Sequence, residues 1–213
     1  MKLIVFDCDS TLSAIEGIDE LARGKGDAVF EEVVALTHAA MNGEVAIDEI
    51  FAKRLDIIQP DRATADAVGQ LYIDQIEPTA KATIDALREQ GWTPIIISGG
   101  FIYPIQPLAD LLGIDRIEAV PLHFNDDGSY AGFTASPTTR NGGKPEIIKQ
   151  LKEEFQPSAI VMVGDGVSDL ETASEVDAFV GFGRYTPREK VKAAAEHFVY
   201  AIDEIPAIIE GLG

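Results

Sequence analysis

Short runs of wholly apolar residues recur along the chain, and amphipathic stretches of helical length separate them. The runs that we expect to be strands lie at residues 3–6, 94–97, 159–163, 178–180 and 198–200. A short strand without polar residues is typical of a sheet that is buried on both faces, and such sheets are usually parallel and covered by helices. The sequence therefore predicts an α/β fold with a doubly wound, mostly parallel sheet.

Residues 14–76 break this alternation because they contain no convincing strand. Their pattern indicates four helices, near residues 18–23, 28–41, 47–57 and 63–76. A crossover between two parallel strands needs only one helix. We therefore expect residues 14–76 to form an inserted helical cap, and residues 1–13 and 77–213 to form the catalytic core.

In the core, the sequence marks the ends of three helices and predicts one β-hairpin. Helices are expected at residues 79–90, 102–112 and 145–155, because Gly91 and Gly113 follow the first two and Pro145 opens the third. Asp127-Gly128 lies between alternating residues, which is the signal of a tight turn between two strands. Residues 121–134 are therefore predicted to form a small β-hairpin flap within the core.

The charge of the chain limits the partners that it can have. The sequence has 36 acidic and 17 basic residues, a formal net charge of −19. A surface this negative repels nucleic acids and anionic lipids. The apolar runs are too short to span a bilayer, and the start of the chain is too short for a signal peptide. We expect a cytoplasmic protein that binds neither nucleic acid nor membrane.

Two aspartates, Asp7 and Asp9, follow the first expected strand directly. Side chains alternate along an extended chain, so both carboxylates can point the same way, at the carboxyl end of a parallel strand where α/β proteins bind ligands. Two neighbouring carboxylates are costly unless a cation lies between them or one of them keeps a proton. Both remedies are typical of catalytic sites.

A second acidic pair follows the expected strand at residues 159–163. Asp165 and Asp169 lie in the segment Gly164-Asp165-Gly166-Val167-Ser168-Asp169. With Asp7, these two carboxylates can surround one hard divalent cation. Ligands that are all oxygen atoms favour magnesium over zinc.

The other strand ends suggest a site for an anion. Ser98-Gly99-Gly100 follows residues 94–97 and offers a hydroxyl and backbone amides. Lys144 lies at the start of another expected helix. A phosphate held by magnesium, Lys144 and these amides would make the site locally positive in a strongly negative protein.

Four motifs in this order resemble those of the haloacid dehalogenase superfamily of aspartate-nucleophile phosphatases. They are Asp7-Cys8-Asp9-Ser10-Thr11, Ser98, Lys144 and the segment 164–169. The resemblance extends over nearly the whole chain to the phosphoserine phosphatase family within it. The stretches that carry it are EGIDELA (16–22), RLDIIQP (54–60), ISGGF (97–101), GSYAGF (128–133), GGK (142–144), GDGVSD (164–169) and DAFVGFG (177–183).

This resemblance implies magnesium-dependent hydrolysis of O-phospho-L-serine to L-serine and phosphate, the last step of serine biosynthesis. Asp7 would be the nucleophile that forms an aspartyl-phosphate, and Asp9 would be the general acid and base. One Mg²⁺ per active site would be held by Asp7, Asp165, the backbone carbonyl of Asp9 and, through water, Asp169. A monomer or homodimer is expected.

The resemblance also assigns residues to the two ends of the substrate. Lys144 with Ser98, Gly99, Gly100 and Ser168 would bind the phosphate. Glu16 would bind the substrate ammonium, Arg54 its carboxylate, and Met41 would contact the substrate in the cap. The sequence has Ser168 where many members have asparagine, and Ile47 where some have an aromatic residue.

Three alternatives remain for the function. The first is a phosphotransferase that passes the phosphoryl group to another alcohol such as homoserine. The second is a phosphatase for another small phosphomonoester. The third is a phosphorylated signalling domain of the receiver type, although a receiver's acceptor aspartate usually follows its third strand and such a domain needs no cap.

Overall fold

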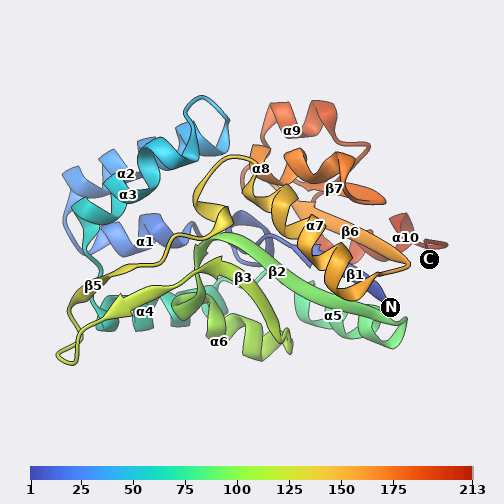
Figure 1. The fold of residues 1–213 in the computed structure, drawn as a ribbon, viewed down its shortest axis with the longest axis horizontal. Coiled ribbons are helices and arrows are strands. Elements are labelled where there is room, and N and C mark those ends of the chain that lie inside the picture. Colours follow the sequence, from blue (N-terminus) through green and yellow to red (C-terminus); the bar gives the residue numbers. More distant parts are fainter. Residues whose placement is uncertain (213) are drawn as a thin grey trace.

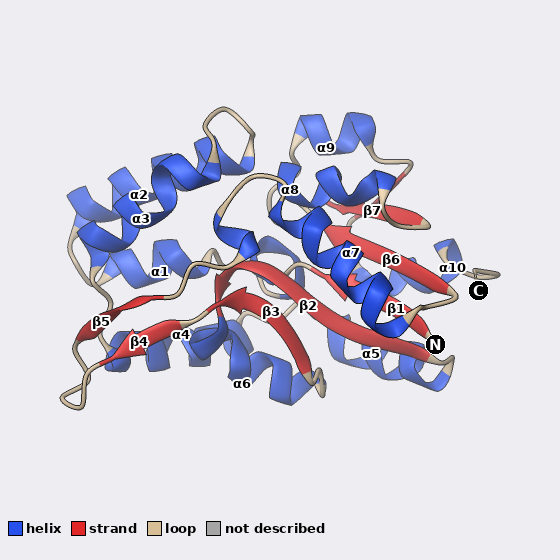
Figure 2. Ribbon diagram, viewed as in Figure 1, coloured by secondary structure: helices blue, strands red, loops and turns tan. Residues whose placement is uncertain are grey.

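The centre of the fold is a six-stranded parallel sheet with β1 (Lys2–Phe6) in its middle. The computed structural model describes residues 1–212, without the side chain of Met41. The strand order is β3-β2-β1-β6-β7-β8, and every neighbouring pair is parallel (Figure 2). The other strands are β2 (Trp92–Phe101), β3 (Arg116–Val120), β6 (Ala159–Gly164), β7 (Ala178–Phe182) and β8 (His197–Val199). The predicted α/β fold with a parallel sheet is confirmed.

Helices cover the sheet and fill the connection between β1 and β2 (Figure 1). That connection contains α1 (Gly17–Arg23), α2 (Asp27–Met41), α3 (Ile47–Ile58), α4 (Arg62–Asp74) and α5 (Ala80–Glu89). The remaining helices are α6 (Ile102–Leu112), α7 (Gly143–Phe155), α8 (Val167–Leu170), α9 (Glu189–Ala194) and α10 (Ile205–Ile208). The expected four helices before β2 are thus present, followed by α5, which the sequence placed in the core.

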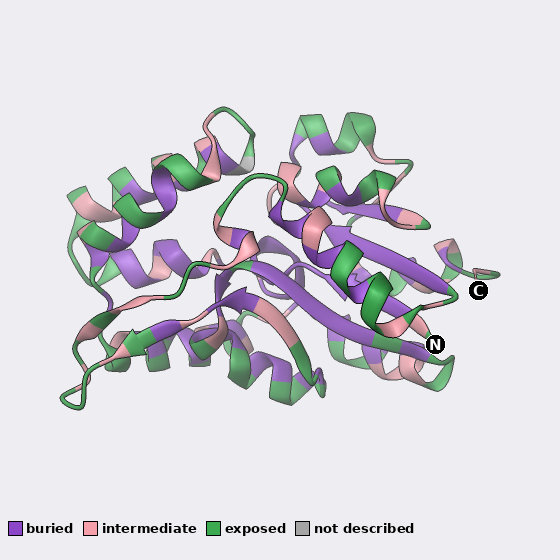
Figure 3. Ribbon diagram, in the orientation of Figure 1, coloured by how far each residue is buried: buried purple, intermediate pink, exposed green. Residues whose placement is uncertain are grey.

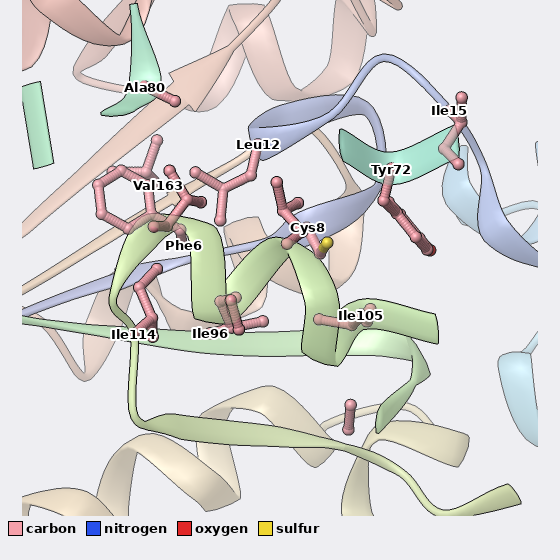
Figure 4. Packing of buried hydrophobic residues seen from close by; sticks show 14 of the residues in the cluster. Phe6, Cys8, Leu12, Ile15, Tyr72, Ala80, Ile96, Ile105, Ile114 and Val163 are labelled. Carbon is pink, nitrogen blue, oxygen red and sulfur yellow. The ribbon is translucent and has the colours of Figure 1, made fainter. Parts of the chain in front are cut away.

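Alternate residues of β1 pack into two different cores. Ile4 and Phe6 lie in a large cluster with apolar residues of α5 and α6, part of which is seen in Figure 4. Leu3 and Val5 lie in a second cluster with α7 and α9. All four side chains are fully buried, and the central strands are mostly buried in Figure 3. A strand that is buried on both faces has to be apolar throughout, which explains the sequence of β1.

The chain leaves the core and returns to it at one place. Ser13 and Ile76 form an isolated antiparallel bridge, and the Glu77 amide donates to the Leu12 carbonyl at 2.8 Å. These contacts lie beside the predicted cap boundaries, 13/14 and 76/77, which stay a prediction. The last helix of the insertion, α4, packs closely on α6: a Cβ on Gly69 would lie 3.3 Å from the Pro104 carbonyl oxygen.

The predicted hairpin is also confirmed. β4 (Leu122–Phe124) and β5 (Tyr130–Phe133) pair antiparallel in a separate two-stranded sheet. Gly128 in the turn has φ 85°, a left-handed conformation that favours glycine. Its carbonyl accepts a hydrogen bond of 2.8 Å from the Arg62 amide, so the tip of the hairpin contacts the start of α4.

Two parts of the sheet differ from the expectation. Strand β3 was not predicted, because its sequence Arg-Ile-Glu-Ala-Val mixes charged and apolar residues. β3 is an edge strand and its first three residues are only partly covered, so it does not need the apolar run of a central strand. Strand β2 also extends beyond the predicted residue 97 to Phe101, with a register shift against β3 between Ile97 and Phe101.

The structure shows no helix within residues 1–212 that combines the length and the apolar character required to cross a bilayer. The expected cytoplasmic location and the monomeric or homodimeric state stay predictions.

Two leucines of α6 test the assignment of the core. Leu108 is fully buried, whereas Leu111, one turn along the same helix, is 43% exposed. Leu108→Ala should lower the free energy of unfolding by about 2–5 kcal/mol, because it removes apolar contacts and leaves a cavity. Leu111→Ala should change it by roughly 0.5 kcal/mol or less. Urea unfolding of both variants measures the difference, and equal losses would contradict the packing described for α6.

Candidate active site

Asp7 and Asp9 are positioned by an irregular turn after β1. The Asp7 amide donates to the Val163 carbonyl of β6 at 2.8 Å. Residues Cys8–Leu12 form a single wide turn in which Asp9 is extended and Ser10 has φ 51°. A left-handed conformation is uncommon for serine and is often found at functional sites. Both aspartates line one cavity, as expected, but Asp9 reaches it through this turn rather than by alternation along a strand.

Asp165 and Asp169 approach Asp7 from the end of β6. The three side chains are buried, and each offers an oxygen atom within 4.8 Å of the others. Gly164 makes this approach possible, because a Cβ at that position would lie 2.2 Å from the Asp169 Cγ atom. Asp169 also accepts a 2.9 Å hydrogen bond from the Gly166 amide. Its carboxylate therefore both holds the start of α8 and faces the acidic cluster.

Lys144 is a cation in contact with two carboxylates of this cluster. Its Nζ atom lies 2.9 Å from Asp7 Oδ1 and 2.5 Å from Asp169 Oδ1. Burial alone would lower the pKa of this lysine, but Asp169 and Asp7 outweigh burial and raise it. The first residue of α7, Gly143, allows the helix start to lie against the chain at Pro137, where a Cβ would come within 1.7 Å of the carbonyl oxygen.

The acidic cluster fits a divalent cation. Burial and the charge of Asp7 raise the pKa of Asp165 to about 7 and that of Asp169 to about 8. Asp165 Oδ2 accepts a hydrogen bond from Arg188 at 3.0 Å, whereas its buried Oδ1 has no hydrogen-bond partner among the described residues. An unpartnered buried carboxylate oxygen is costly. Three converging carboxylates with a free oxygen are the donor set that a hard divalent cation binds.

Asp9 is held by two hydrogen bonds from the inserted helices. The Tyr72 hydroxyl of α4 donates to Oδ1 at 2.5 Å, and the Gly17 amide at the start of α1 donates to Oδ2 at 3.1 Å. Burial and the neighbouring Asp7 raise the pKa of Asp9 to about 7, although both hydrogen bonds oppose that shift. Asp9 can therefore exist as an acid or as a carboxylate near neutral pH.

Glu16 links the first turn of the insertion to the site. The Ser10 hydroxyl donates to Glu16 Oε1 at 2.7 Å, and the Arg188 guanidinium lies 3.7 Å from the same oxygen. Burial and the charges of Asp9 and Asp165 raise the pKa of Glu16 well above its usual value. A cation bound beside Glu16 would stabilise its ionised form.

Arg54 is buried within the insertion and forms no ion pair with an acidic side chain among the residues that the structure describes. Its Nη1 atom donates to the Thr37 hydroxyl at 3.1 Å, and that hydroxyl in turn donates to Asp19 Oδ1 at 2.6 Å. Its Nε atom is buried and has no hydrogen-bond partner among the described residues. Burial lowers the pKa of Arg54. The guanidinium thus has a donor available for an anionic ligand.

One cavity brings most of the predicted site residues together. It is lined by Asp7, Asp9, Glu16, Arg54, Ser98, Gly99, Gly100, Lys144 and Ser168. Asp165 and Asp169 are fully buried beside Asp7. The side chain of Met41, at the end of α2, lies outside the described residues, so its predicted contact with the substrate stays a prediction.

Ser98, Gly99 and Gly100 were expected to follow a strand that ends at residue 97, but in the structure they continue that strand and form one wall of the cavity. Ser98, Gly99 and Gly100 belong to the extended strand β2, and the Gly100 amide donates to the Ser98 hydroxyl at 2.9 Å. A Cβ on Gly100 would approach the Ser98 hydroxyl to 3.1 Å and Asp9 Oδ1 to 3.5 Å. Gly100 therefore allows β2 to lie close to the turn Cys8–Leu12, which carries Asp9.

Several residues of the site were not predicted from the sequence. Phe51, Thr37, Thr138 and Arg140 also line the cavity, and Tyr72 and Arg188 contact Asp9 and Asp165. Phe51 lies one helical turn after Ile47 and supplies an aromatic ring to the cavity wall. The spacing of four residues was a readable signal for Phe51, whereas nothing in the local pattern around Tyr72 or Arg188 distinguishes them.

The model of the haloacid dehalogenase-like hydrolase family matches residues 1–177. The phosphoserine phosphatase of Bos taurus is 38% identical over 212 residues, which cover 97% of this chain and 92% of that protein. The chain belongs to the haloacid dehalogenase-like hydrolases, in the phosphoserine phosphatase family. Both levels of the resemblance seen in the sequence are confirmed.

Solved structures agree with this assignment. A structure described as a phospho-aspartyl intermediate analogue of phosphoserine phosphatase has a TM-score of 0.85 and 27% identity, covering 98% of this chain and 99% of that chain. A substrate-bound phosphoserine phosphatase complex has a TM-score of 0.85 and 26% identity, covering 98% of both chains. The chain has the fold of these two phosphatases over almost its whole length.

The contacts of Lys144 predict a large effect on stability. Lys144→Met leaves Asp7 and Asp169 buried beside each other without their cation. Removing one partner of a buried ion pair typically costs about 3–5 kcal/mol, so urea unfolding in metal-free buffer should show a loss of that size. Lys149→Met is the matched control on the same helix, since its side chain is 60% exposed, and it should lose roughly 1 kcal/mol or less. Similar losses in both variants would contradict the ion pairs described here.

Proposed function

We propose that this chain hydrolyses O-phospho-L-serine to L-serine and phosphate through an aspartyl-phosphate on Asp7. One observation carries the proposal: a single cavity presents a partner for each charged group of a phosphorylated amino acid. Lys144 faces the phosphate site, Arg54 offers a cation for a carboxylate, and Glu16 offers an anion for an ammonium group. The kinship with phosphoserine phosphatases supports the same reaction.

The two aspartates divide the chemistry between them. Asp7 attacks the phosphorus atom, and the bond between phosphorus and the serine oxygen breaks as Asp9 gives its proton to that oxygen. Asp9, now ionised, then takes a proton from the water that attacks the aspartyl-phosphate, which releases phosphate and restores both residues. The pKa of about 7 for Asp9 suits both directions of this proton transfer.

Charge on the phosphoryl group is offset by cations and hydrogen-bond donors. Lys144 is already in contact with Asp7, and Ser98, Gly99, Gly100 and Ser168 line the same cavity. Donors fixed in advance stabilise developing charge without reorganising during the reaction. Mg²⁺, held by Asp7, Asp165, the backbone carbonyl of Asp9 and, through water, Asp169, would further offset the negative charge of the phosphoryl oxygens.

The screen that tests this function measures phosphate release from phosphoserine, phosphothreonine, phosphoethanolamine and sugar phosphates, with and without Mg²⁺. We expect the highest kcat/KM with phosphoserine and multiple turnovers. The Asp7→Asn variant should be inactive, because an amide does not attack phosphorus usefully. A clear preference for another substrate would reject phosphoserine, and a phosphate ester formed from added homoserine would indicate a phosphotransferase.

Magnesium should stabilise the protein through the acidic cluster. At a Mg²⁺ concentration about 100 times its Kd, binding contributes about 2.7 kcal/mol, which raises the Tm of a domain this size by roughly 5–10 °C. The Asp165→Asn variant should lose most of this shift, because its neutral amide replaces one of three anionic ligands. Asp126→Asn, at the exposed hairpin tip, should keep it. A full shift in Asp165→Asn would remove Asp165 from the metal site.

Arg54 should decide between substrates with and without a carboxylate. Arg54→Ala leaves a bound carboxylate unpaired, which costs roughly 2–5 kcal/mol in comparable buried pairs. The kcat/KM for phosphoserine should therefore fall by about 30- to 4000-fold. Phosphoethanolamine has no carboxylate, so its hydrolysis should hardly change. The control is Lys53→Ala, because the neighbouring Lys53 side chain is 57% exposed; equal losses on both substrates in Arg54→Ala would indicate only a structural role.

A further inference from the structure

Tyr72 has no part in the function proposed above, although it touches the catalytic acid. It lies on α4, 63 residues after Asp9 in the sequence, and its side chain is fully buried. The ring belongs to the main hydrophobic core, and Tyr72 is labelled among the residues of that cluster in Figure 4. Its hydroxyl is the one polar atom of the side chain, and it donates to Asp9 Oδ1 at 2.5 Å.

The Tyr72 hydroxyl lies so close to the backbone of Gly17 that it leaves no room for a side chain there. A Cβ on Gly17 would lie 2.0 Å from Tyr72 Oη and 3.0 Å from the ring carbon that carries it. Gly17 begins α1 and does not have a positive φ, so its backbone conformation does not require glycine. The space taken by the tyrosine side chain excludes any other residue at position 17. The same Gly17 donates its amide to the other oxygen of Asp9.

We propose that Tyr72 is a positioning residue that holds the carboxyl group of Asp9 in the orientation from which it transfers its proton. This inference rests on the role proposed for Asp9 as general acid and base. Tyr72 and Gly17 each bind a different oxygen, so together they fix the rotation of the carboxyl group about both of its side-chain bonds. The phenol ring, held in the core, is a rigid support for the donor.

Packing alone accounts for the ring but not for the hydroxyl. A phenylalanine would fill the same apolar space, and it would crowd Gly17 less. A buried tyrosine hydroxyl needs a hydrogen-bond partner, and here that partner is the group that must be aligned with the leaving oxygen. Proton transfer requires the acid within hydrogen-bond reach of its target, and a displacement of about 1 Å can reduce the rate about 100-fold.

The experiment compares two substrates in the Tyr72→Phe variant. With phosphoserine the leaving group is the serine alkoxide, which needs a proton, whereas p-nitrophenyl phosphate has a leaving group that needs none. The kcat/KM for phosphoserine should fall by about 10- to 100-fold, and that for p-nitrophenyl phosphate should change by roughly threefold or less. Preserved aryl phosphate hydrolysis also demonstrates that the variant is folded. An equal loss on both substrates would overturn the proposal, since a disturbed fold affects both alike.

A double-mutant cycle with Asp9→Asn shows whether Tyr72 acts through Asp9. In Asp9→Asn, which has lost the acid, adding Tyr72→Phe should have no further effect on phosphoserine hydrolysis. Additive losses in this double-mutant cycle would mean that Tyr72 acts independently of Asp9, and the proposal would fail. Tyr103→Phe is the matched control, because Tyr103 is 38% exposed on α6 and bonds to Asp66. It should leave both substrates unchanged.

The same comparison separates this proposal from the proposed function. If the wild type hydrolyses another alkyl phosphate in preference to phosphoserine, that substrate replaces phosphoserine in both experiments. The identity of the substrate is then wrong, and the alkyl-to-aryl ratio still reports on Tyr72. If the ratio in Tyr72→Phe equals that of the wild type, Tyr72 has no positioning role, whatever the natural substrate is.

Discussion

Four carboxylates buried within one site are the constraint around which the rest of this structure is arranged. Asp7, Asp9, Asp165 and Asp169 are each at most 7% exposed, and like charges repel strongly where water is excluded. Parallel pairing of β1 with β6, in the register Phe6 to Val163, brings two of the acidic segments side by side. Lys144 from α7 then contacts two of the four carboxylates. Arg188 bonds to a third carboxylate, Asp165. The fold thus concentrates negative charge at two strand ends and supplies the opposing cations from other parts of the chain.

The sequence was informative where local pattern and chemistry coincide. The acids after β1 and β6 were readable because a wholly apolar strand ended directly in carboxylates and glycines. The edge strand β3 was not readable, because partial exposure allows it charged residues. The roles of Tyr72 and Arg188 could not be predicted for a different reason. The role of a buried polar side chain depends on its hydrogen-bond partner, which here comes from a distant part of the sequence. Asp9 and Asp165, their partners, lie 63 and 23 residues away.

The negative charge of the whole chain repels an anionic substrate, whereas Lys144 and Arg54 at the cavity attract it. The chain carries a formal charge of −19, but exposed charges more than about 8 Å away are largely screened at physiological salt. Lys144 and Arg54 are both buried at the cavity, where screening is weak. Binding of an anion is therefore decided by these few groups, and the acidic surface mainly affects solubility and long-range repulsion.

The inserted helices supply more than a cover for the cavity. α1 and α4 hold Asp9 through Gly17 and Tyr72, whereas α3 carries Arg54, the group that would read the substrate carboxylate. α4 is also packed against α6 of the core. Asp9 keeps both of its hydrogen bonds only while α1 and α4 stay in place. Glu16, which we propose binds the substrate ammonium, directly precedes α1. Recognition of that group and the orientation of Asp9 therefore depend on the same helix, whereas the proposed carboxylate contact of Arg54 depends on α3.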